Sequence, residues 1–403
     1  MKKKIMNSIK KIVSEDFKFW EVIILMGLTA VVGITLGGFI IKKNYGLDKT
    51  GTFTPALQDF VNNYNYIANN YYGEIDEDEL LKKALETILE EIDDPYAAYL
   101  DENESNNLNI QLSGSYRGMG IEVGTLTTGQ LMITGVFSAS PAEKAGLQSG
   151  DIILSLNDES IQGISGSEFA NKIKELSGSF MLTVLRNETE EEFNIRLDTV
   201  VIKSVESKMV EKNIGYVYIS IFADNTYEQL QAALDSLNNA GMQSLIIDLR
   251  ENTGGYLTSV EKILGLFLDN SHVIYQIQDK SGITKYYSKG KTTVTYPIVI
   301  LTNSATASAS EIMTAALKEE LGAISVGKKT YGKGSAQKLH TLDNGSKYKF
   351  TTQKWLTPLG LSIDKVGIDV NYDIDMDKAY YDEPIIENDN QLQYAIKLLK
   401  MNN

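Results

Sequence analysis

Residues 296–311 read YPIVILTNSATASASE, and this stretch decides the class of fold. Residues 296–301 form a continuous apolar run with β-branched side chains, which is typical of a buried parallel strand. Residues 302–310 are small and polar and residues 312–317 are good helix formers, so we expect a helix to begin near Ser308 or Ala309. Strand, turn and helix in this order predict an α/β layer with Ser308 at a helix N-terminus. Unpaired amides and the helix dipole favour a developing oxyanion there.

A lysine that could activate this serine follows 25 residues later, where Lys333 stands between Gly332 and Gly334. A serine hydroxyl is a weak nucleophile at neutral pH and needs a neighbouring base. The chain has two histidines and no cysteine, so the commoner histidine-based and cysteine-based sites have little to draw on. Burial lowers the pKa of a lysine and can make it a base. The pattern therefore predicts a serine–lysine hydrolase site.

Other interpretations of the same residues exist. Ser308-x-x-Glu311 also fits a capping box, in which Ser308 is only an N-cap, and a lysine in a glycine turn is usually solvated. Residues 327–333 approach a nucleotide-binding P-loop, but Gly334 replaces the Ser or Thr that coordinates magnesium, and residues 335–342 predict a strand where a helix is needed. The two histidines and the scattered acids form no recognisable metal ligand set.

Two segments around these residues resemble the signature of the bacterial C-terminal processing peptidases, also called tail-specific proteases. Residues 306–311 read TASASE and residues 330–337 read TYGKGSAQ. The resemblance implies that Ser308 is the nucleophile, Lys333 the general base and Gln337 the residue that orients the lysine. Thr306 stands where the family usually has serine, a position away from the nucleophile.

A third segment, SLIIDLRENTGG at residues 244–255, is similar to the family's D-L-R-x-N-x-G-G. The resemblance implies that the amides of Gly254 and Ala309 form the oxyanion hole. From the residues alone, Gly254-Gly255 is only a turn that ends a strand. Residues 89–100, 355–360, 367–370 and 389–392 resemble further family segments, although the third lacks the family's proline.

Residues 112–200 resemble a PDZ domain. Gly118-Met119-Gly120-Ile121 would be the loop whose backbone amides hold a peptide's terminal carboxylate. Residues 169–176 have apolar side chains at helical spacing and fit the helix beside the binding groove, and residues 181–186 alternate as a strand. Arg186 matches an arginine that couples the PDZ position to the active site in some family members; the alternative is a solvated arginine at a strand end. Such a domain either captures substrate tails or acts mainly as a gate.

The N-terminal region predicts a membrane anchor. Val22–Ile41 is free of charge and long enough to span a bilayer at ~1.5 Å per residue. Six lysines precede this segment and two follow it directly, a bias that places the N-terminus in the cytoplasm. A cleaved signal peptide is the alternative, but no small-x-small site follows, so we expect an uncleaved signal anchor.

Charge separates this region from the remainder. Residues 1–43 carry a net charge of +5 out of −15 for the whole chain, so the remainder carries −20. A strongly acidic remainder argues against nucleic acid partners, which need basic patches. The absence of cysteine means that no disulfide stabilises the chain.

A chain of 403 residues is too long for one compact core. We expect an α+β multidomain protein with a crotonase-like α/β protease core and a PDZ domain placed before it. The expected parts are a basic cytoplasmic tail (1–21), a transmembrane signal anchor (22–41), a helical N-terminal region (50–111), the PDZ domain (112–200), the serine protease core (201–380) and a C-terminal helix (381–403).

The resemblance implies a membrane-anchored, extracytoplasmic serine endopeptidase that cleaves proteins near their C-termini. The expected partners are protein or peptide substrates with free apolar C-termini and the cell membrane; the resemblance also implies a homodimer formed through terminal helices, and no cofactor is expected. The alternative is a catalytically silent, membrane-tethered PDZ scaffold.

Overall fold

The computed structural model describes residues 54–401. The chain divides into two units, and the boundary between them in the sequence falls between Leu85 and Glu86. The predicted membrane anchor, Val22–Ile41, lies outside the described residues. Within 54–401, none of the helices combines the length and the apolar character that a bilayer span requires.

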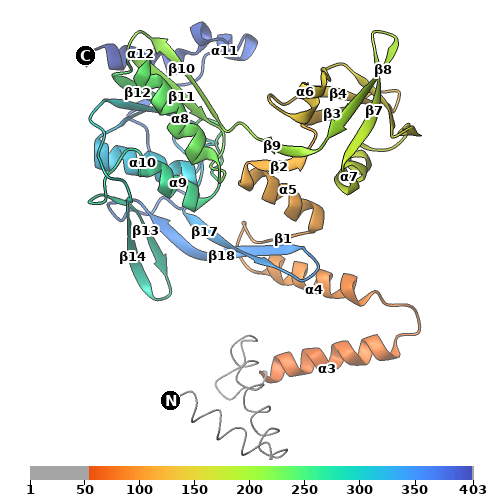
Figure 1. Ribbon diagram of the computed structural model, residues 1–403. Helices are drawn as coiled ribbons and strands as arrows, with labels where there is room; N and C mark the ends of the chain where they lie inside the picture. Colours follow the sequence, from red (N-terminus) through yellow and green to blue (C-terminus); the bar gives the residue numbers. More distant parts are fainter. Residues whose placement is uncertain (1–53, 402–403) are drawn as a thin grey trace, which may run out of the picture. The chain divides into compact units, whose positions relative to one another are not determined.

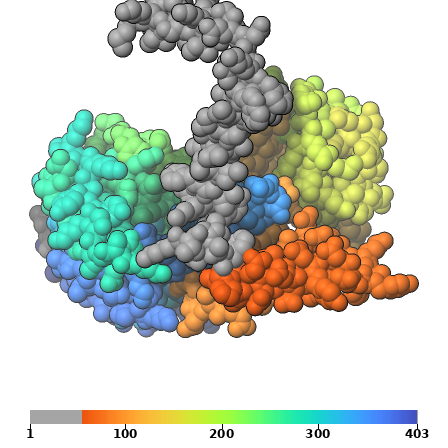
Figure 2. Space-filling model, turned by 90° about the horizontal axis from the view of Figure 1, so that it is seen from below, coloured from red at the N-terminus to blue at the C-terminus, as the bar shows by residue number. Residues whose placement is uncertain are grey.

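The described part of the first unit consists of helix α3 (Pro55–Asn70) and the start of helix α4 (Glu77–Glu91), and both lie within the region 50–111 that we expected to be helical. Helix α3 has a proline in its first turn, and α4 has acidic residues in its first turn; both are favourable at helix N-termini. Helix α3 buries none of its side chains, and Leu57, Phe60 and Ile67 are exposed. Figure 2 shows the atoms of this helix in red-orange.

The predicted PDZ region, residues 112–200, begins at the end of helix α5 and contains two sheets. Its main sheet has the order β3-β4-β5-β7-β8 with antiparallel neighbours, and β6 pairs with β5. Strand β3 begins at Ile121, the last residue of the predicted carboxylate loop. The strands are β2 (Ser115–Gly118), β3 (Ile121–Thr125), β4 (Leu131–Val136), β5 (Ile152–Leu156), β6 (Glu159–Ser160), β7 (Ser179–Arg186), β8 (Thr189–Arg196) and β9 (Asp198–Val201), and the helices are α5 (Glu102–Ser113), α6 (Pro141–Ala145) and α7 (Gly166–Glu175).

Alternation along β7 builds the core of this region. Phe180, Leu182 and Val184 are buried there at every second position, as expected for a strand with one face inward. Phe169 and Ile173, one helical turn apart on α7, are buried in the same cluster. The predicted helix and strand are thus confirmed.

The larger core is a six-stranded sheet in the order β10-β11-β12-β15-β16-β19, parallel from β11 onward. The predicted apolar strand before Ser308 is β15, and the helix predicted after it is α10, which starts at Ala309. The strands are β10 (Val205–Glu211), β11 (Ile214–Ile219), β12 (Ser244–Asp248), β15 (Ile298–Thr302), β16 (Ile324–Gly327) and β19 (Tyr372–Asp373).

Helices cover both faces of this sheet, so its central strands are buried throughout. Leu245 and Ile247 pack with α8, α9 and α10, whereas Ile246 between them packs with α12 (Figure 1). The helices are α8 (Thr226–Asn239), α9 (Leu257–Leu264), α10 (Ala309–Leu321), α11 (Lys378–Asp382) and α12 (Asn390–Met401), and a 3-10 turn, η1, spans Ile386–Asn388.

A second sheet carries the strand that follows Lys333. Strand β18 (Lys347–Leu356) pairs antiparallel with β1 (Ala98–Leu100), β13 (Val273–Asp279) and β17 (Ser335–Thr341), and β14 (Gly282–Tyr287) pairs with β13. Lys333 lies in the loop that leads from β16 to β17. Strand β1 brings residues that precede the PDZ region onto this protease sheet.

A buried ion network joins the end of β12 to α12. Arg250 donates from Nη2 to Asp248 Oδ2 at 2.6 Å and to Asp389 Oδ2 at 2.7 Å, and from Nη1 to Gln391 Oε1 at 3.0 Å. The hydroxyl of Tyr216 donates to Asp248 Oδ2 at 2.8 Å. Both carboxylates are almost fully buried, at 2% and 3% exposure, so they depend on this guanidinium for their counter-ion.

We predict that Arg250→Met lowers the free energy of unfolding by roughly 3–5 kcal/mol, because it leaves two buried carboxylates without a partner cation. The matched control is Glu211→Gln, which breaks the exposed 2.6 Å pair between Glu211 and Lys400 and should cost less than about 1 kcal/mol. Urea unfolding measures both. Equal, small losses in the two variants would contradict the assigned role of Arg250.

Candidate active site

Ser308 occupies a strained position between β15 and α10. Its backbone angles are φ 56° and ψ −117°, outside the common regions for a side-chain-bearing residue, and such conformations cost about 1–3 kcal/mol. Among residues 54–401, its hydroxyl makes no hydrogen bond. A free hydroxyl on a strained strand-to-helix turn is the arrangement expected of a nucleophile.

The capping role predicted as the alternative is only half present. The Ser308 N–H donates to Glu311 Oε2 at 2.8 Å, but the Glu311 N–H donates to the backbone carbonyl of Ser308 at 2.9 Å, and the Ser308 side chain accepts no cap hydrogen bond. Ser308 is nevertheless the N-cap residue of α10, opposite Glu311. An ordinary N-cap residue has β-region backbone angles, so capping alone does not explain the φ of 56° at Ser308.

Glu311 holds both halves of the site through one carboxylate. Its Oε2 accepts the N–H groups of Ser308 and Lys333, at 2.8 and 2.9 Å, and its Oε1 accepts the Gly332 N–H at 2.7 Å and the Thr330 hydroxyl at 2.6 Å. The residue is fully buried. Burial raises the pKa of Glu311, whereas these four hydrogen bonds oppose the rise. Sequence reasoning treated Glu311 as a helix cap and missed this connection.

The surroundings of the Lys333 amine shift its pKa in the direction that a general base needs. Its pKa is lowered by burial and by the nearby Lys349, while Asp94 and Glu311 act in the opposite direction. The Nζ atom lies 4.7 Å from the centroid of the Tyr96 ring. No hydrogen bond joins Nζ to the hydroxyl of Ser308 in the described part of the chain, and catalytic contacts of this kind often tighten only when substrate binds.

The glycines flanking Lys333 allow its loop to press against the backbone that follows. A Cβ on Gly332 would lie 2.7 Å from the Gly367 nitrogen, and one on Gly334 would lie 2.7 Å from the Asp364 nitrogen. Both contacts are shorter than a real Cβ tolerates, so glycine is required at both positions.

The predicted oxyanion residues lie against the nucleophile. A Cβ on Gly254, whose φ is 112°, would come within 2.9 Å of the Ser308 Cβ and 3.1 Å of the Ala309 nitrogen. The Ala309 N–H has no acceptor among the described residues, whereas the Gly254 N–H donates to Asn252 Oδ1 at 2.9 Å. The amide of Ala309 is thus available to an oxyanion, and that of Gly254 is already engaged. The oxyanion role of both residues stays a prediction.

Asn252 ties this loop to the nucleophile loop and was not singled out from the sequence. It is fully buried, and its carbonyl accepts the Ala307 N–H at 3.0 Å and the Ser310 hydroxyl at 2.9 Å. Its side-chain amide donates to the Ile219 carbonyl at 2.8 Å. Its place in the D-L-R-x-N-x-G-G segment was the signal that could have identified it.

Thr306 keeps the hydroxyl that the family's serine supplies, since its Oγ1 donates to the Leu249 carbonyl at 2.8 Å. Gln337 does not contact Lys333. Its Nε2 donates to Ser335 Oγ at 2.8 Å and to Thr351 Oγ1 at 3.1 Å. A direct role of Gln337 in orienting the lysine stays a prediction.

The predicted carboxylate loop offers unpaired donors. Gly118, Met119 and Gly120 are buried, and the carbonyls of Met119 and Gly120 accept hydrogen bonds from Ala142 and Phe137 at 2.8 and 3.0 Å. The amides of Met119 and Gly120 have no acceptor within residues 54–401. Two consecutive free amides suit a terminal carboxylate.

Arg186 is not the solvated arginine of the alternative interpretation. It donates from Nε and Nη2 to the two oxygens of Asp151, at 2.7 and 2.6 Å, and from Nη2 to the Gly146 carbonyl at 2.9 Å. Nη1 reaches Glu191 at 3.1 Å, and the side chain is 17% exposed. These contacts lie inside the PDZ region, where they fix β7 against β5 and α6. A coupling role for Arg186 stays a prediction.

The P-loop alternative is wrong. Strand β16 ends at Gly327, and the loop after it leads into strand β17 without an intervening helix, so the helix that a P-loop requires is missing. Within the described residues, no group of three or more His, Cys, Asp or Glu side chains could hold a metal ion.

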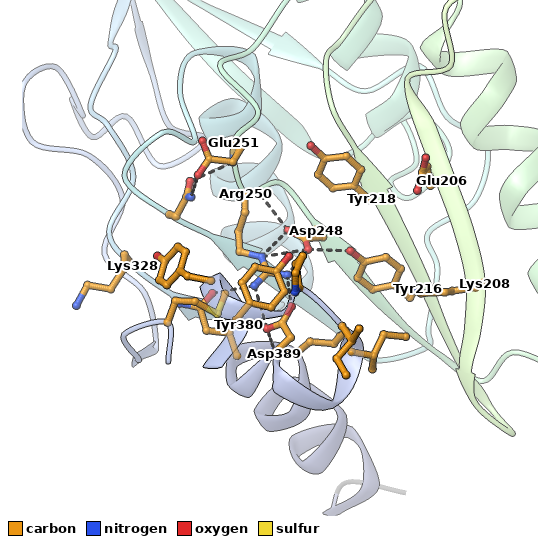
Figure 3. Close-up of a pocket in the computed structure, with 18 of the residues that line it drawn as sticks. Glu206, Lys208, Tyr216, Tyr218, Asp248, Arg250, Glu251, Lys328, Tyr380 and Asp389 are labelled. Atoms are coloured by element: carbon orange, nitrogen blue, oxygen red, sulfur yellow. Dashed lines mark hydrogen bonds and ion pairs between the residues drawn. The ribbon is translucent and has the colours of Figure 1, made fainter. Parts of the chain in front are cut away.

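A pocket of about 650 Å³ lies at the carboxyl ends of the parallel strands, beside the active-site loops. Figure 3 shows Arg250 between Asp248 and Asp389 in this pocket, with Glu251 above them. Glu251 has a φ of 61°, and its Oε1 accepts from Asn303 Nδ2 at 2.5 Å while its N–H donates to Asn303 Oδ1 at 3.2 Å. This pair joins the loop that leads to Gly254 to the loop that leads to Ser308. Asn303 and Ser304 line the pocket, whereas Ser308 does not.

Comparison with known proteins places these features in one group. The models of peptidase family S41, the PDZ domain and the N-terminal domain of the activating protease CtpB match residues 213–374, 132–186 and 42–104. Carboxy-terminal processing protease CtpA of Bacillus subtilis is 34% identical over 85% of this chain and 74% of its own length. CtpB of the same organism is 36% identical over 76% of this chain and 65% of its own length.

A probable CtpA-like serine protease of Staphylococcus aureus is 33% identical over 92% of this chain and 75% of its own length. Among solved structures, a photosystem II D1 C-terminal processing protease matches 78% of this chain and 86% of that chain, at 24% identity and a TM-score of 0.47.

We predict that Glu311→Gln abolishes most activity and costs roughly 2–4 kcal/mol of stability, because the amide places an N–H donor against N–H groups that need acceptors. Steady-state kinetics and urea unfolding measure the two effects. Glu319→Gln on the same helix is the control, since Glu319 accepts a single hydrogen bond, from the Leu359 N–H, which an amide oxygen can replace. Wild-type activity in Glu311→Gln would show that the carboxylate does not organise the site.

Proposed function

Since this chain belongs to peptidase family S41, among the carboxy-terminal processing proteases, we propose that Ser308 and Lys333 catalyse cleavage of protein substrates near their C-termini. One observation carries this assignment. The Glu311 carboxylate accepts the backbone N–H groups of both residues on one oxygen, which brings the strained serine and the lysine together. A catalytically silent scaffold would not need the strained backbone of Ser308 or the buried carboxylate of Glu311.

The proposed reaction is acyl transfer. Neutral Lys333 takes the Ser308 proton as Oγ attacks the scissile carbonyl carbon, and the amides of Ala309 and Gly254 stabilise the oxyanion. The lysine ammonium then gives its proton to the leaving amine as the peptide bond breaks. Water, deprotonated by the same amine, attacks the acyl ester, and the carboxylic acid product leaves while the serine regains its proton.

The PDZ domain supports a preference for free chain ends. The unpaired amides of Met119 and Gly120 would hold the terminal carboxylate, and the tail would add as a strand to the sheet edge, with alternate apolar side chains in pockets. Whether Arg186 transmits this binding to the protease core belongs to the same proposal.

We also propose that the enzyme is anchored by Val22–Ile41 with the protease outside the cytoplasm, and that it forms homodimers. The lysine bias around the uncharged segment supports the topology. The exposed apolar side chains of α3 support a protein interface.

The anchor and the dimer can be tested on one preparation. We expect the full chain in the membrane fraction of the producing cells and, after extraction in mild detergent, at twice the mass of one chain by light scattering. Ile67→Lys should halve that mass without releasing the protein from the membrane. A chain recovered from the soluble fraction would contradict the anchor, and a wild-type monomer would contradict the dimer.

The cleavage test uses an unstructured protein that ends in apolar residues. We expect wild type to cleave it and Ser308→Ala and Lys333→Ala to lose at least about 10³-fold in kcat/KM. Amidation of the substrate's C-terminus should weaken cleavage about tenfold or more, because it removes the charge that the free amides recognise. Unchanged melting temperatures in both variants control for folding. Cleavage by Ser308→Ala at the wild-type rate would refute the assignment.

A further inference from the structure

The amine of Lys333 faces a segment that precedes the PDZ domain in the chain. Residues 92–97 lead from α4 into β1, and β1 is fixed to β18 by the pairs Ala98–Lys349 and Leu100–Lys347. The Tyr96 ring centroid lies 4.7 Å from Lys333 Nζ, within the range of a cation–π contact. A segment outside the part matched by the S41 model therefore forms a wall of the site.

Asp94 is held in this wall by three hydrogen bonds. Its Oδ2 accepts the Thr351 N–H at 2.6 Å, and its Oδ1 accepts the Thr351 hydroxyl at 3.1 Å and the Tyr96 N–H at 3.0 Å. The Thr351 Oγ1 accepts in turn from Gln337 Nε2 at 3.1 Å. A chain of hydrogen bonds thus runs from Gln337 through Thr351 to Asp94. Gln337 is therefore linked to Asp94, whose charge acts on Lys333.

We propose that Asp94 and Tyr96 are positioning residues for Lys333, which hold its amine and stabilise the ammonium that forms when it takes the Ser308 proton. This inference rests on the proposed function, because it assigns two more residues to the same site.

The physical reason lies in the two demands on a general base. The amine needs to be neutral at the start, which burial and Lys349 favour, and it needs enough basicity to take the proton, which Asp94 and Glu311 favour. A ring face attracts a cation as well. Without these neighbours, a half-buried lysine would be a weaker base.

Three further titratable groups, Tyr331, Asp364 and Glu311, act on Tyr96. Burial, together with Tyr331, raises the pKa of Tyr96 to about 12. The hydroxyl of Tyr96 therefore stays protonated over the range in which the lysine titrates, and its ring remains neutral.

The direction of the expected effect follows from the charge of Asp94. Activity requires neutral Lys333, so it rises as the pH rises through the pKa of the lysine. Asp94→Asn removes an anion that favours the ammonium, which lowers this pKa. The rising limb of the pH profile then moves by about one pH unit toward acid, while the maximal kcat falls because the base is weaker.

The experiment measures kcat/KM and kcat against pH with the full chain and the unstructured substrate. We expect the acid shift in Asp94→Asn and, more weakly, in Tyr96→Leu, and a near-normal profile in Tyr96→Phe, which keeps the ring. Asp93→Asn is the matched control, since it removes the same charge from an exposed neighbour. A limb that stays at the wild-type pH in both Asp94→Asn and Tyr96→Leu, with kcat reduced equally at every pH, would overturn the inference.

A second measurement does not depend on cleavage. In a Ser308→Ala background, the rate at which acetic anhydride labels Lys333 at each pH, followed by mass spectrometry, gives the pKa of this amine directly. We expect a lower value when Asp94→Asn is added and none of this change with Asp93→Asn. Equal values would refute the role of Asp94 even if cleavage is confirmed. Conversely, a wild-type chain that cleaves nothing would refute the proposed function and leave the labelling result to decide this inference.

Discussion

The carboxylate of Glu311 is the interaction on which the active site depends. Its four hydrogen bonds satisfy donors from the turn before α10 and from the loop after β16. Each of these loops is held by its own strand. This carboxylate connects the two, together with the hydrogen bond from the Tyr331 N–H to the Thr306 carbonyl at 3.0 Å. A buried acceptor surrounded by four donors is also selective, because no neutral side chain of the same shape can accept all four. The geometry of the serine and the lysine is therefore set through the backbone, before their side chains interact.

The rest of the fold keeps that carboxylate and its donors in place. The central strands of the core sheet are buried on both faces, which fixes the ends from which the active-site loops leave. Arg250 attaches the end of β12 to α12, and Glu251 attaches the following residues to the nucleophile loop through Asn303. Asn252 then receives the amide before the nucleophile. Three consecutive residues thus connect this strand end to α12 and, at two points, to the loop before Ser308.

Local patterns were enough to predict much of this. The apolar run before Ser308 gave β15, the good helix formers after it gave α10, and the alternation over 181–186 gave the inner face of β7. The candidate nucleophile, base and oxyanion glycine came from motif resemblance, and the structure places them in adjoining loops. Glu311 could not be predicted beyond its role as a cap, because three of its four donors come from a segment about twenty residues further along the chain. The role of Asp94 could not be predicted for the same reason, because its partner Thr351 lies in a strand that follows the PDZ region in the sequence.

The hydrogen bond between Asp94 and Thr351 spans 257 residues of sequence, and this has a consequence for the order of folding. At a synthesis rate of about 5–20 residues per second, Asp94 leaves the ribosome roughly 13–50 s before its partner does. The PDZ region, whose sheet closes within residues 121–196, is complete long before the wall around Lys333 can form. A nascent chain can therefore fold its PDZ region before Lys333 has been synthesised.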